Sequence, residues 1–196
     1  MVRIAVLVSG GGTNLQALID GAPYENGELS LVVSSNPDAF ALERAKKAGI
    51  ETVTLSPKEY ADRAVYTDAV VDALLEKDIG LVVFAGFMFI LTPRFAEVFA
   101  NRALNVHPAL IPSFCGKGFY GLRVHQAALD TGVKVTGASV HFVTAGADEG
   151  PIVSQRAIDI LPGDTPETLQ RRVMEKCEWP LLTAAVRDFC LSGHSS

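Results

Sequence analysis

Two adjoining segments decide the fold: Val2-Arg3-Ile4-Ala5-Val6-Leu7-Val8, followed by Ser9-Gly10-Gly11-Gly12-Thr13-Asn14-Leu15. The first is a short run rich in Val, Ile and Leu, which is typical of a strand that is buried on both faces of a parallel sheet. The second is a glycine-rich turn that leads into a helix. A strand, a glycine turn and a helix in this order predict the first unit of an α/β fold.

The same alternation of apolar runs and helical stretches continues along the chain. We expect strands at residues 2–8, 29–34, 51–55, 81–85, 103–107, 133–143 and 152–158. The clearest helix between them places one set of side chains on its buried side: Tyr66, Ala69, Val70, Ala73 and Leu74. The pattern predicts a Rossmann-like α/β fold, with a mainly parallel sheet and helices on both faces. With 196 residues, 48% of them hydrophobic, and no linker or repeat, the chain fits one domain over residues 1–196.

The last third of the chain departs from this pattern in two ways. Only residues 144–151 separate the last two strands, which is too few for a helical crossover, so we expect a C-terminal antiparallel hairpin. A final helix is predicted from about residue 165 to 189, because residues 164–167 resemble a capping box with Pro166 in the first turn. Pro180 should kink or interrupt this helix, since proline lacks the amide proton that a helix interior uses.

Charge and hydropathy narrow the class of partner. The net charge is -5 and no dense run of Lys or Arg occurs, which argues against nucleic acid or a membrane surface as the main partner. No stretch reaches the roughly 18 apolar residues of a membrane span, and the N-terminal apolar run is too short for a signal sequence. We expect a cytoplasmic protein that acts on small molecules. The sequence does not distinguish a monomer from a homodimer.

The cysteines suggest neither a disulfide framework nor a metal site. There are three of them, Cys115, Cys177 and Cys190, which is an odd number at wide spacing. Reduced thiols and no bound metal are therefore expected.

The glycine turn is a candidate phosphate site. Its backbone amides and the start of the following helix can bind an anion, and Thr13 and Asn14 add two hydrogen-bonding side chains. A P-loop would need a Lys-Ser/Thr ending, which is missing. A dinucleotide site would need a third glycine where Leu15 stands and an acidic residue after the second strand, which ends at residues 34–37 without one. The turn therefore indicates a monophosphate site, and a plain strand-to-helix turn is the simpler alternative.

A carboxamide and an imidazole form a second candidate site. Asn105 and His107 lie two positions apart at the end of a predicted strand, so both side chains point to the same face, and Pro108 follows. Asp148, in the loop after the strand that bears Ser139 and His141, can raise the pKa of an imidazole and fix its orientation. A cationic imidazole and a carboxamide can together stabilise an oxyanion, which points to polarisation of a carbonyl group.

Five motifs together resemble a known family. They are Ser-Gly-Gly-Gly-Thr-Asn-Leu at 9–15, Ala-Gly-Phe-Met at 85–88, Asn-Val-His-Pro at 105–108, Gly-Ala-Ser-Val-His-Phe-Val at 137–143 and Asp-Glu-Gly-Pro at 148–151. Their order and spacing are similar to those of the phosphoribosylglycinamide formyltransferase family, the folate-dependent enzymes of purine synthesis. The resemblance covers nearly the whole chain.

The resemblance implies transfer of the formyl group of 10-formyltetrahydrofolate, as co-substrate, to the amine of 5'-phosphoribosylglycinamide. It assigns the phosphate and the rest of that substrate to Gly12, Thr13, Asn14 and Glu178. It assigns the folate site to Arg63, Met88, Phe89, Ile90, Leu91, Asn105 and the hairpin loop up to Asp148.

The resemblance further implies a catalytic trio of Asn105, His107 and Asp148. The substrate amine would attack the formyl carbon, with His107 and Asn105 stabilising the tetrahedral oxyanion. Asp148 would keep His107 protonated, and a water near Ser139 would relay the proton to the leaving nitrogen.

Several positions depart from the family pattern or have a second interpretation. Better-known members carry a basic residue where this chain has Phe89, so a salt link to the folate tail is lost. The loop at residues 113–121 differs from the best-known bacterial form, and its three glycines suggest a mobile lid. His125 matches a family histidine, with a solvent-facing helix residue as the alternative. Cys115 is a weak candidate nucleophile, since nothing in the sequence lowers its pKa, and His141 is interpreted as structural.

Three other functions fit parts of the sequence. Formyltetrahydrofolate deformylase shares the catalytic trio but usually carries an extra N-terminal domain, whereas the first strand here begins at Val2. Methionyl-tRNA formyltransferase adds a C-terminal barrel and a basic face, and this sequence has neither. A non-catalytic folate or nucleotide sensor would have lost His107 or Asp148, and both are present. The ribonucleotide formyltransferase is the preferred interpretation.

Overall fold

The computed structural model describes residues 1–193 and contains one seven-stranded sheet. The strand order is β3-β2-β1-β4-β5-β6-β7. The strands are β1 (Val2–Val8), β2 (Gly27–Ser34), β3 (Glu51–Thr54), β4 (Leu81–Phe84), β5 (Ala103–His107), β6 (Val135–Phe142) and β7 (Ile152–Asp159). Neighbours from β3 to β5 pair in parallel, whereas β6 pairs antiparallel with both β5 and β7. The predicted mainly parallel sheet with a C-terminal antiparallel hairpin is confirmed.

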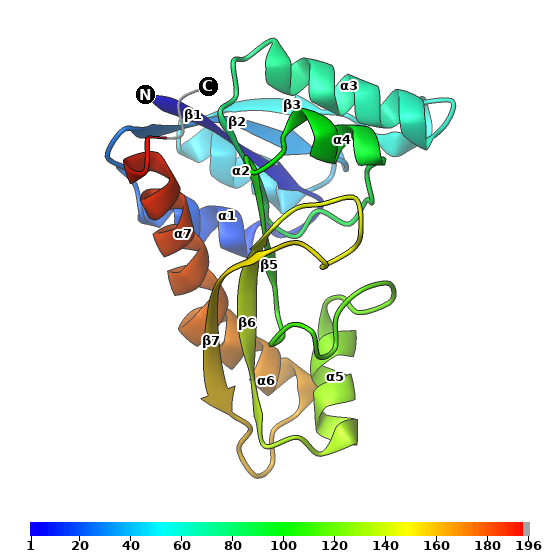
Figure 1. Ribbon diagram of the computed structural model, residues 1–196, viewed down its shortest axis with the longest axis vertical. Helices are drawn as coiled ribbons and strands as arrows, with labels where there is room; N and C mark the ends of the chain where they lie inside the picture. The colour runs from blue at the N-terminus through cyan, green and yellow to red at the C-terminus, as the bar shows by residue number, and fades with distance from the viewer. Residues whose placement is uncertain (194–196) are drawn as a thin grey trace.

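Helices cover both faces of the sheet (Figure 1). They are α1 (Thr13–Asp20), α2 (Phe40–Lys47), α3 (Arg63–Leu75), α4 (Pro93–Val98), α5 (Leu122–Thr131), α6 (Pro166–Val173) and α7 (Trp179–Leu191), together with a 3-10 turn at Pro57–Glu59 and a π-helical turn at Met174–Glu178. Within residues 1–193 no helix is both long and apolar enough to cross a membrane.

The two faces of β1 belong to two separate hydrophobic cores. Ile4, Val6 and Val8 pack with α1, α2, α6 and α7, whereas Ala5 and Leu7 pack with α3 and α4. Successive side chains of a strand point to opposite faces, so an unbroken apolar run can serve both cores. This explains why residues 2–8 lack the alternation of a half-exposed strand.

The predicted buried side of α3 is rotated slightly in the structure. Tyr66, Val70 and Leu74 are fully buried as expected, but Thr67 and Val71 share that face, and the two alanines of the predicted set are only half-buried. The Asp62 side chain caps the helix by accepting hydrogen bonds from two backbone amides of the first turn. Helix α3 is thereby fixed with Arg63 as its first residue.

The C-terminal helix begins one residue later than predicted and is interrupted before Pro180. Its cap is Thr165, which exchanges hydrogen bonds with Thr168 in a capping box, and the expected cap Asp164 pairs with Arg172 instead. The interruption is the π-helical turn, in which the Trp179 amide donates to the carbonyl of Met174, five residues earlier. The extra residue in this turn accommodates a proline that cannot continue the α-helical hydrogen-bond pattern.

The remaining differences concern the ends of strands. Strand β6 spans Val135–Phe142 rather than residues 133–143, and β2 begins two residues earlier than expected. Neither difference moves a candidate site residue. Asn105 and His107 still lie in the last three residues of β5, and Ser139 and His141 lie within β6.

Candidate active site

The candidate site lies where the strand order of the sheet changes direction. From β1 the chain proceeds outward to β2 and β3, then returns to place β4 on the other side of β1. Loops that follow the carboxyl ends of β1 and β4 diverge at such a point and leave a crevice, which is the usual ligand site of an open α/β sheet. The glycine turn follows β1, residues 86–92 follow β4, and Asn105 and His107 end β5. Three predicted motifs therefore meet at one edge.

The glycine turn has the geometry of an anion site. None of the backbone amides of residues 10–14 has an acceptor within the described part of the chain, and these amides surround the N-terminus of α1. Gly12 adopts a φ of 71°, and a Cβ atom there would lie 2.6 Å from the Cβ atom of Ala41 in α2. Only glycine fits this close approach and this backbone conformation. Arg44 donates a 2.8 Å hydrogen bond to the Gly11 carbonyl and adds positive charge beside the turn.

Glu178 joins the C-terminal segment to the glycine turn. Its carboxylate is buried and accepts a 3.1 Å hydrogen bond from Asn14. Burial raises the pKa of Glu178 to about 7, and the Asn14 contact only partly offsets this effect. The π-helical turn that ends at Glu178 directs this side chain toward α1. Two predicted substrate residues that are far apart in sequence are thus in direct contact.

Thr13 occupies a more exposed position than Asn14. Its hydroxyl contacts the sulfur of Met174 at 3.8 Å, at the rim where the π-helical turn meets α1. Both ends of this turn therefore touch the N-terminus of α1, which closes one side of the anion site.

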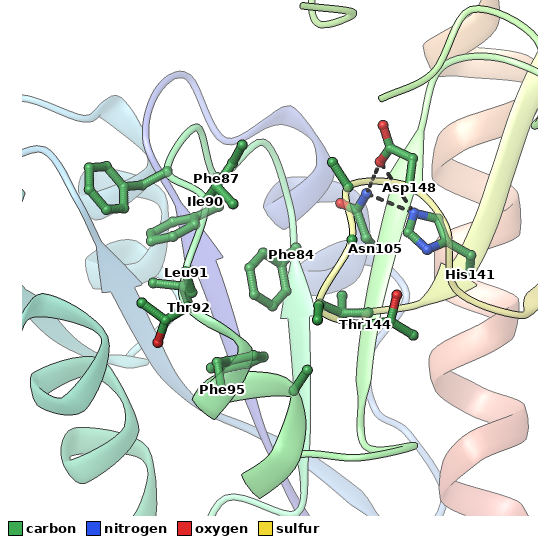
Figure 2. Close-up of a pocket in the computed structure, with 16 residues that line it drawn as sticks. Phe84, Phe87, Ile90, Leu91, Thr92, Phe95, Asn105, His141, Thr144 and Asp148 are labelled. Carbon is green, nitrogen blue, oxygen red and sulfur yellow. Dashed lines mark hydrogen bonds and ion pairs between the residues drawn. The ribbon is translucent and has the colours of Figure 1, made fainter. Parts of the chain in front are cut away.

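A pocket of about 140 Å³ lies between the segment after β4 and the loop after β6. Figure 2 shows aromatic and aliphatic side chains on one side of it, among them Phe84, Phe87 and Phe95, and polar side chains on the other. The polar end is formed by Asn105, His141 and Asp148. An apolar pocket with a few polar groups at one end suits a flat, partly polar ring system.

The predicted folate residues divide into two groups. Phe89, Ile90, Leu91 and Asn105 line the pocket, whereas Met88 is 58% exposed and its side chain is not part of the lining. The Phe89 ring packs edge-on against Tyr66, with 4.8 Å between ring centroids. Arg63 is exposed at the start of α3 and also lies outside the lining. The side of the pocket near Phe89 is therefore apolar.

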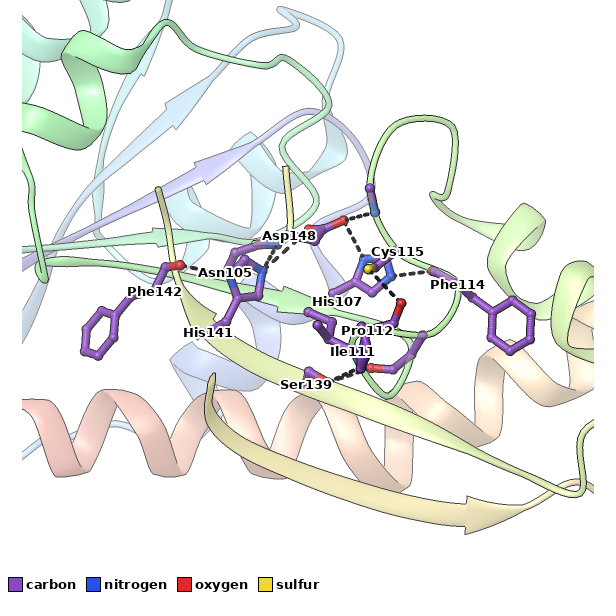
Figure 3. Close-up of polar contacts among 12 residues, drawn as sticks. Asn105, His107, Ile111, Pro112, Phe114, Cys115, Ser139, His141, Phe142 and Asp148 are labelled. Carbon is purple, nitrogen blue, oxygen red and sulfur yellow. Dashed lines mark hydrogen bonds and ion pairs between the residues drawn. The ribbon is translucent and has the colours of Figure 1, made fainter. Parts of the chain in front are cut away.

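Asn105, His107 and Asp148 converge as the sequence predicts (Figure 3). The Nδ1 atom of His107 lies 3.5 Å from one Asp148 oxygen, and Asn105 Nδ2 donates to the other at 3.3 Å. The ring of His107 is almost fully buried. Its Nε2 atom lies 2.8 Å from the carbonyl oxygen of Phe114. Both ring nitrogens thus face acceptors, and only an imidazole with both protons can donate to each of them.

The pKa of the Asp148 carboxyl lies below its ordinary value. Burial acts to raise it, but the contacts with His141 and His107 and the hydrogen bond from the Gly116 amide act more strongly in the opposite direction. An anionic Asp148 at neutral pH can hold the ring of His107 in orientation through its Nδ1 atom. Asp148 itself adopts a left-handed backbone conformation with a φ of 59°.

His141 also lines the candidate site, in addition to the structural role expected of it from the sequence. Its Nε2 atom lies 3.0 Å from Asn105 Nδ2 and 3.5 Å from Asp148, and its ring lines the pocket. The other nitrogen, Nδ1, lies 2.9 Å from the Phe142 carbonyl and so carries a proton. The Nε2 atom faces both Asn105 Nδ2 and Asp148, so it accepts from the Asn105 carboxamide when it carries no proton and donates to Asp148 when it carries one.

The antiparallel register of β5 and β6 brings His141 to this position. Asn105 lies opposite His141, and His107 lies opposite Ser139. Ser139 and His141 share the two-residue spacing of Asn105 and His107, and this repeated spacing is the one sequence signal for the pairing. The register itself depends on contacts between segments that are distant in sequence.

Ser139 supports the chain beyond His107 and has no free hydrogen-bonding capacity. Its buried hydroxyl donates to the Ala109 carbonyl at 2.7 Å and accepts hydrogen bonds from the Ile111 amide and from Gln155. One proton and two lone pairs are all that a hydroxyl offers. A proton relay through a water on Ser139 would require one of these bonds to break.

The loop at residues 113–121 contacts two members of the candidate catalytic trio. Besides the Phe114 carbonyl on His107, the Gly116 amide donates to Asp148 at 2.9 Å. The thiol of Cys115, between these two residues, has a raised pKa, because burial and the charges of Asp148 and Glu149 all disfavour the thiolate. This geometry does not support a nucleophilic role for Cys115.

His125 is fully buried in α5, so the alternative of a solvent-facing residue is wrong. Burial lowers its pKa to about 4, with a smaller contribution from the charge of His107. Its side chain faces the interior beside Val124 and Ala128 because α5 packs on α6.

Comparisons with known proteins agree with the motifs. The family model described as formyl transferase matches residues 2–185. Phosphoribosylglycinamide formyltransferase of Escherichia coli is 38% identical over 199 residues, which cover 100% of this chain and 92% of that protein. The human trifunctional purine biosynthetic protein adenosine-3 is 42% identical over 174 residues, 87% of this chain. The chain spans 17% of the length of that protein.

Solved structures show the same relationship. Glycinamide ribonucleotide transformylase 1 from Symbiobacterium toebii has a TM-score of 0.90 and 41% identity, covering 98% of this chain and 89% of that chain. Phosphoribosylglycinamide formyltransferase from Brucella melitensis has a TM-score of 0.87 and 39% identity, covering 96% and 95% respectively. The resemblance drawn from the five motifs is confirmed.

Proposed function

This chain belongs to the formyl transferase family, and we propose that it transfers the formyl group of 10-formyltetrahydrofolate to the amine of 5'-phosphoribosylglycinamide in purine biosynthesis. The observation that carries the proposal is the convergence of Asn105, His107 and Asp148, of which Asn105 and Asp148 line the polar end of an apolar pocket. Relatives that this chain covers over nearly their whole length are formyltransferases.

The pocket between residues 86–92 and the loop after β6 is the proposed site of the folate ring. Its apolar wall suits the faces of a pterin, and the groups at the polar end suit ring nitrogens and the formyl-bearing nitrogen. Phe89, Ile90 and Leu91 form the wall nearest the segment after β4, with the backbone of Met88 beside them. Arg63 is proposed to act at longer range, on the charged tail of the folate.

The glycine turn is the proposed phosphate site of the second substrate. Free amides at residues 10–14, with Gly12 and Thr13 at the N-terminus of α1, would hold the phosphate. Asn14 and Glu178 form a hydrogen-bonded pair beside the turn and offer donors and acceptors to a ribose. This arrangement directs the glycinamide amine toward the catalytic trio at the end of β5.

The proposed chemistry is direct attack of the amine on the formyl carbon. A carbon–nitrogen bond forms and the formyl oxygen gains negative charge. The former amine nitrogen then loses a proton, the tetrahedral intermediate breaks its bond to the folate nitrogen, and that nitrogen takes up one proton, so no net proton is released. His107 and Asn105 stabilise the oxyanion, and Asp148 holds His107 as a cation.

The donors of the trio already have partners in the described arrangement. His107 Nε2 donates to Phe114, and the two protons of Asn105 Nδ2 face His141 and Asp148. A substrate oxygen would replace the Phe114 carbonyl as the acceptor for His107. On Asn105 it would replace the Asp148 oxygen, because the 3.3 Å contact of Asn105 with Asp148 is longer than its 3.0 Å contact with His141. Binding of folate would therefore shift the loop at residues 113–121.

One assay tests the function. The protein is incubated with 10-formyltetrahydrofolate, with and without 5'-phosphoribosylglycinamide, and folate absorbance is followed. We expect turnover only when the amine is present. Equal turnover without the amine would identify a deformylase, and no turnover in either tube would identify a non-catalytic binding protein. We further propose that the protein is cytoplasmic. We also propose that it is a monomer or a homodimer, and sedimentation of the purified protein tests this oligomeric state.

A further inference from the structure

The wall of the folate pocket is held by two side-chain hydroxyl groups. Residues 86–91 form no backbone–backbone hydrogen bond with any described residue. The Met88 amide donates to Ser9 Oγ at 2.9 Å, and at the other end the Thr92 amide donates to Thr67 Oγ1 at 3.0 Å. Together with the ring contacts of Phe87 with Phe84 and of Phe89 with Tyr66, these two hydrogen bonds hold the segment in place.

Ser9 is also part of the proposed phosphate site. It is the first residue of the glycine-rich segment 9–15, and its hydroxyl is 2.6 Å from that of Ser35, the residue after β2. Its carbonyl oxygen accepts a hydrogen bond from Asn36. Ser9 therefore links the pocket wall, through its hydroxyl, to the start of the proposed phosphate site, where its main chain continues into the glycine turn. Thr67 has no such connection, because it lies in α3 and donates to the Arg63 carbonyl one turn earlier.

We propose that Ser9 is a positioning residue that couples the two substrate sites. Phosphate binding to the amides of residues 10–14 orders the turn and so fixes the position of Ser9 Oγ. The Ser9 hydroxyl in turn holds the Met88 amide, and with it the wall of the folate pocket. Coupling between two sites is reciprocal, so folate binding also improves binding of the phosphorylated substrate by the same factor. This inference rests on the proposed function, since it requires both ligands.

Two matched variants distinguish coupling between the two substrate sites from a change in the shape of the folate pocket. Ser9→Ala and Thr67→Val each remove one hydroxyl that anchors the pocket wall, but only Ser9 touches the phosphate turn. Tetrahydrofolate and 5'-phosphoribosylglycinamide do not react with each other, so both can be present at equilibrium. The dissociation constant of tetrahydrofolate is measured by calorimetry with and without saturating 5'-phosphoribosylglycinamide, for the wild-type protein and both variants.

The wild-type protein should bind tetrahydrofolate about five-fold more tightly when the second ligand is present, near the lower end of typical coupling. Ser9→Ala should reduce this factor to about one, whereas Thr67→Val should weaken folate binding and keep the factor. Full coupling in Ser9→Ala, equal loss of coupling in Thr67→Val, or no coupling in the wild-type protein would each overturn the proposal. A wild-type protein that binds neither ligand would overturn the proposed function and the coupling with it.

Amide hydrogen exchange tests the structural step without any ligand. Ser9→Ala should speed exchange at the Met88 amide and leave the Thr92 amide unchanged, and Thr67→Val should do the reverse. This result is independent of which substrates the protein uses. Unchanged exchange at Met88 in Ser9→Ala would remove Ser9 from the wall of the pocket even if the proposed function holds.

Discussion

His107 Nε2 lies 2.8 Å from the carbonyl oxygen of Phe114, on the side of the ring opposite Asp148. Phe114 presents this oxygen from a left-handed backbone conformation with a φ of 50°, which is unfavourable for a residue with a bulky side chain. The carbonyl accepts the same hydrogen bond that an oxyanion would accept during the reaction. The loop at residues 113–121 thus occupies one donor atom of His107, and under the proposed mechanism it would move when a substrate oxygen takes its place.

His107→Ala should lower kcat by about 10²–10³-fold, the usual loss for removal of one oxyanion donor. Tetrahydrofolate binding should persist, because the apolar wall of the pocket does not involve this side chain. Turnover is measured by folate absorbance and binding by calorimetry. Activity within a few-fold of the wild-type value would exclude His107 from the mechanism.

His141→Ala should lower kcat about ten-fold, the effect of losing one hydrogen bond of roughly 1.4 kcal/mol that orients a catalytic group. The cause is the loss of the acceptor that holds the Asn105 carboxamide. If His141 acts through Asn105, the double variant with Asn105→Ala should be no slower than Asn105→Ala alone. Additive losses in the double variant would show that the two side chains act separately.

Cys115→Ala should retain activity within about two-fold, because the contacts of this loop with His107 and Asp148 are made by the backbone of Phe114 and Gly116 and not by the thiol. The thiol donates only to the Pro112 carbonyl, and its pKa is raised rather than lowered. Steady-state kinetics are compared with the wild-type protein, and Cys177→Ala is unsuitable as a control because that thiol is buried in the core. Loss of activity by two orders of magnitude would revive the nucleophile interpretation.

The sequence predicts the sheet and the catalytic trio because both follow from local patterns. Apolar runs define the strands, and the spacing of Asn105 and His107 places both side chains on one face of β5. The role of His141 could not be predicted in this way, since it depends on the register between β5 and β6. Neither could the burial of His125, which depends on the packing of α5 against α6, nor the π-helical turn that directs Glu178 toward Asn14.

Glu178→Gln should stabilise the protein at high pH and have little effect at low pH. Burial raises the pKa of Glu178 from an ordinary value of 4.5 to about 7, so between these values the folded state binds more protons than the unfolded state. Stability therefore falls as the pH rises through this window, and the loss is complete above the folded pKa. The variant removes this loss, which amounts to roughly 3 kcal/mol at most. Urea unfolding at about pH 4 and pH 8 measures the difference.

The control for this prediction is Asp164→Asn, which removes one partner of an ion pair and has the opposite dependence of stability on pH. The pKa of Asp164 is lowered, chiefly by its hydrogen bond with Arg172. Its contribution to the stability of the folded protein is therefore present above the unfolded pKa and is lost as the pH falls through the folded pKa. Asp164→Asn should therefore destabilise the protein at pH 8 rather than stabilise it. The same sign for both variants would contradict the assignment for Glu178.

Gly12→Ala and Gly11→Ala should differ in stability although they are adjacent. At Gly12 the backbone has a φ of 71°, and an added Cβ would lie 2.6 Å from Ala41 Cβ and 2.8 Å from its Cα, so α2 must move away from the turn. The combined strain should lower the free energy of unfolding by about 1–3 kcal/mol. At Gly11 an added Cβ meets nothing within 4 Å and the φ is outside the left-handed region, so the change should stay within about 0.5 kcal/mol. Urea unfolding without ligand reports the fold alone, and equal stability of the two variants would show that the turn does not require glycine at position 12.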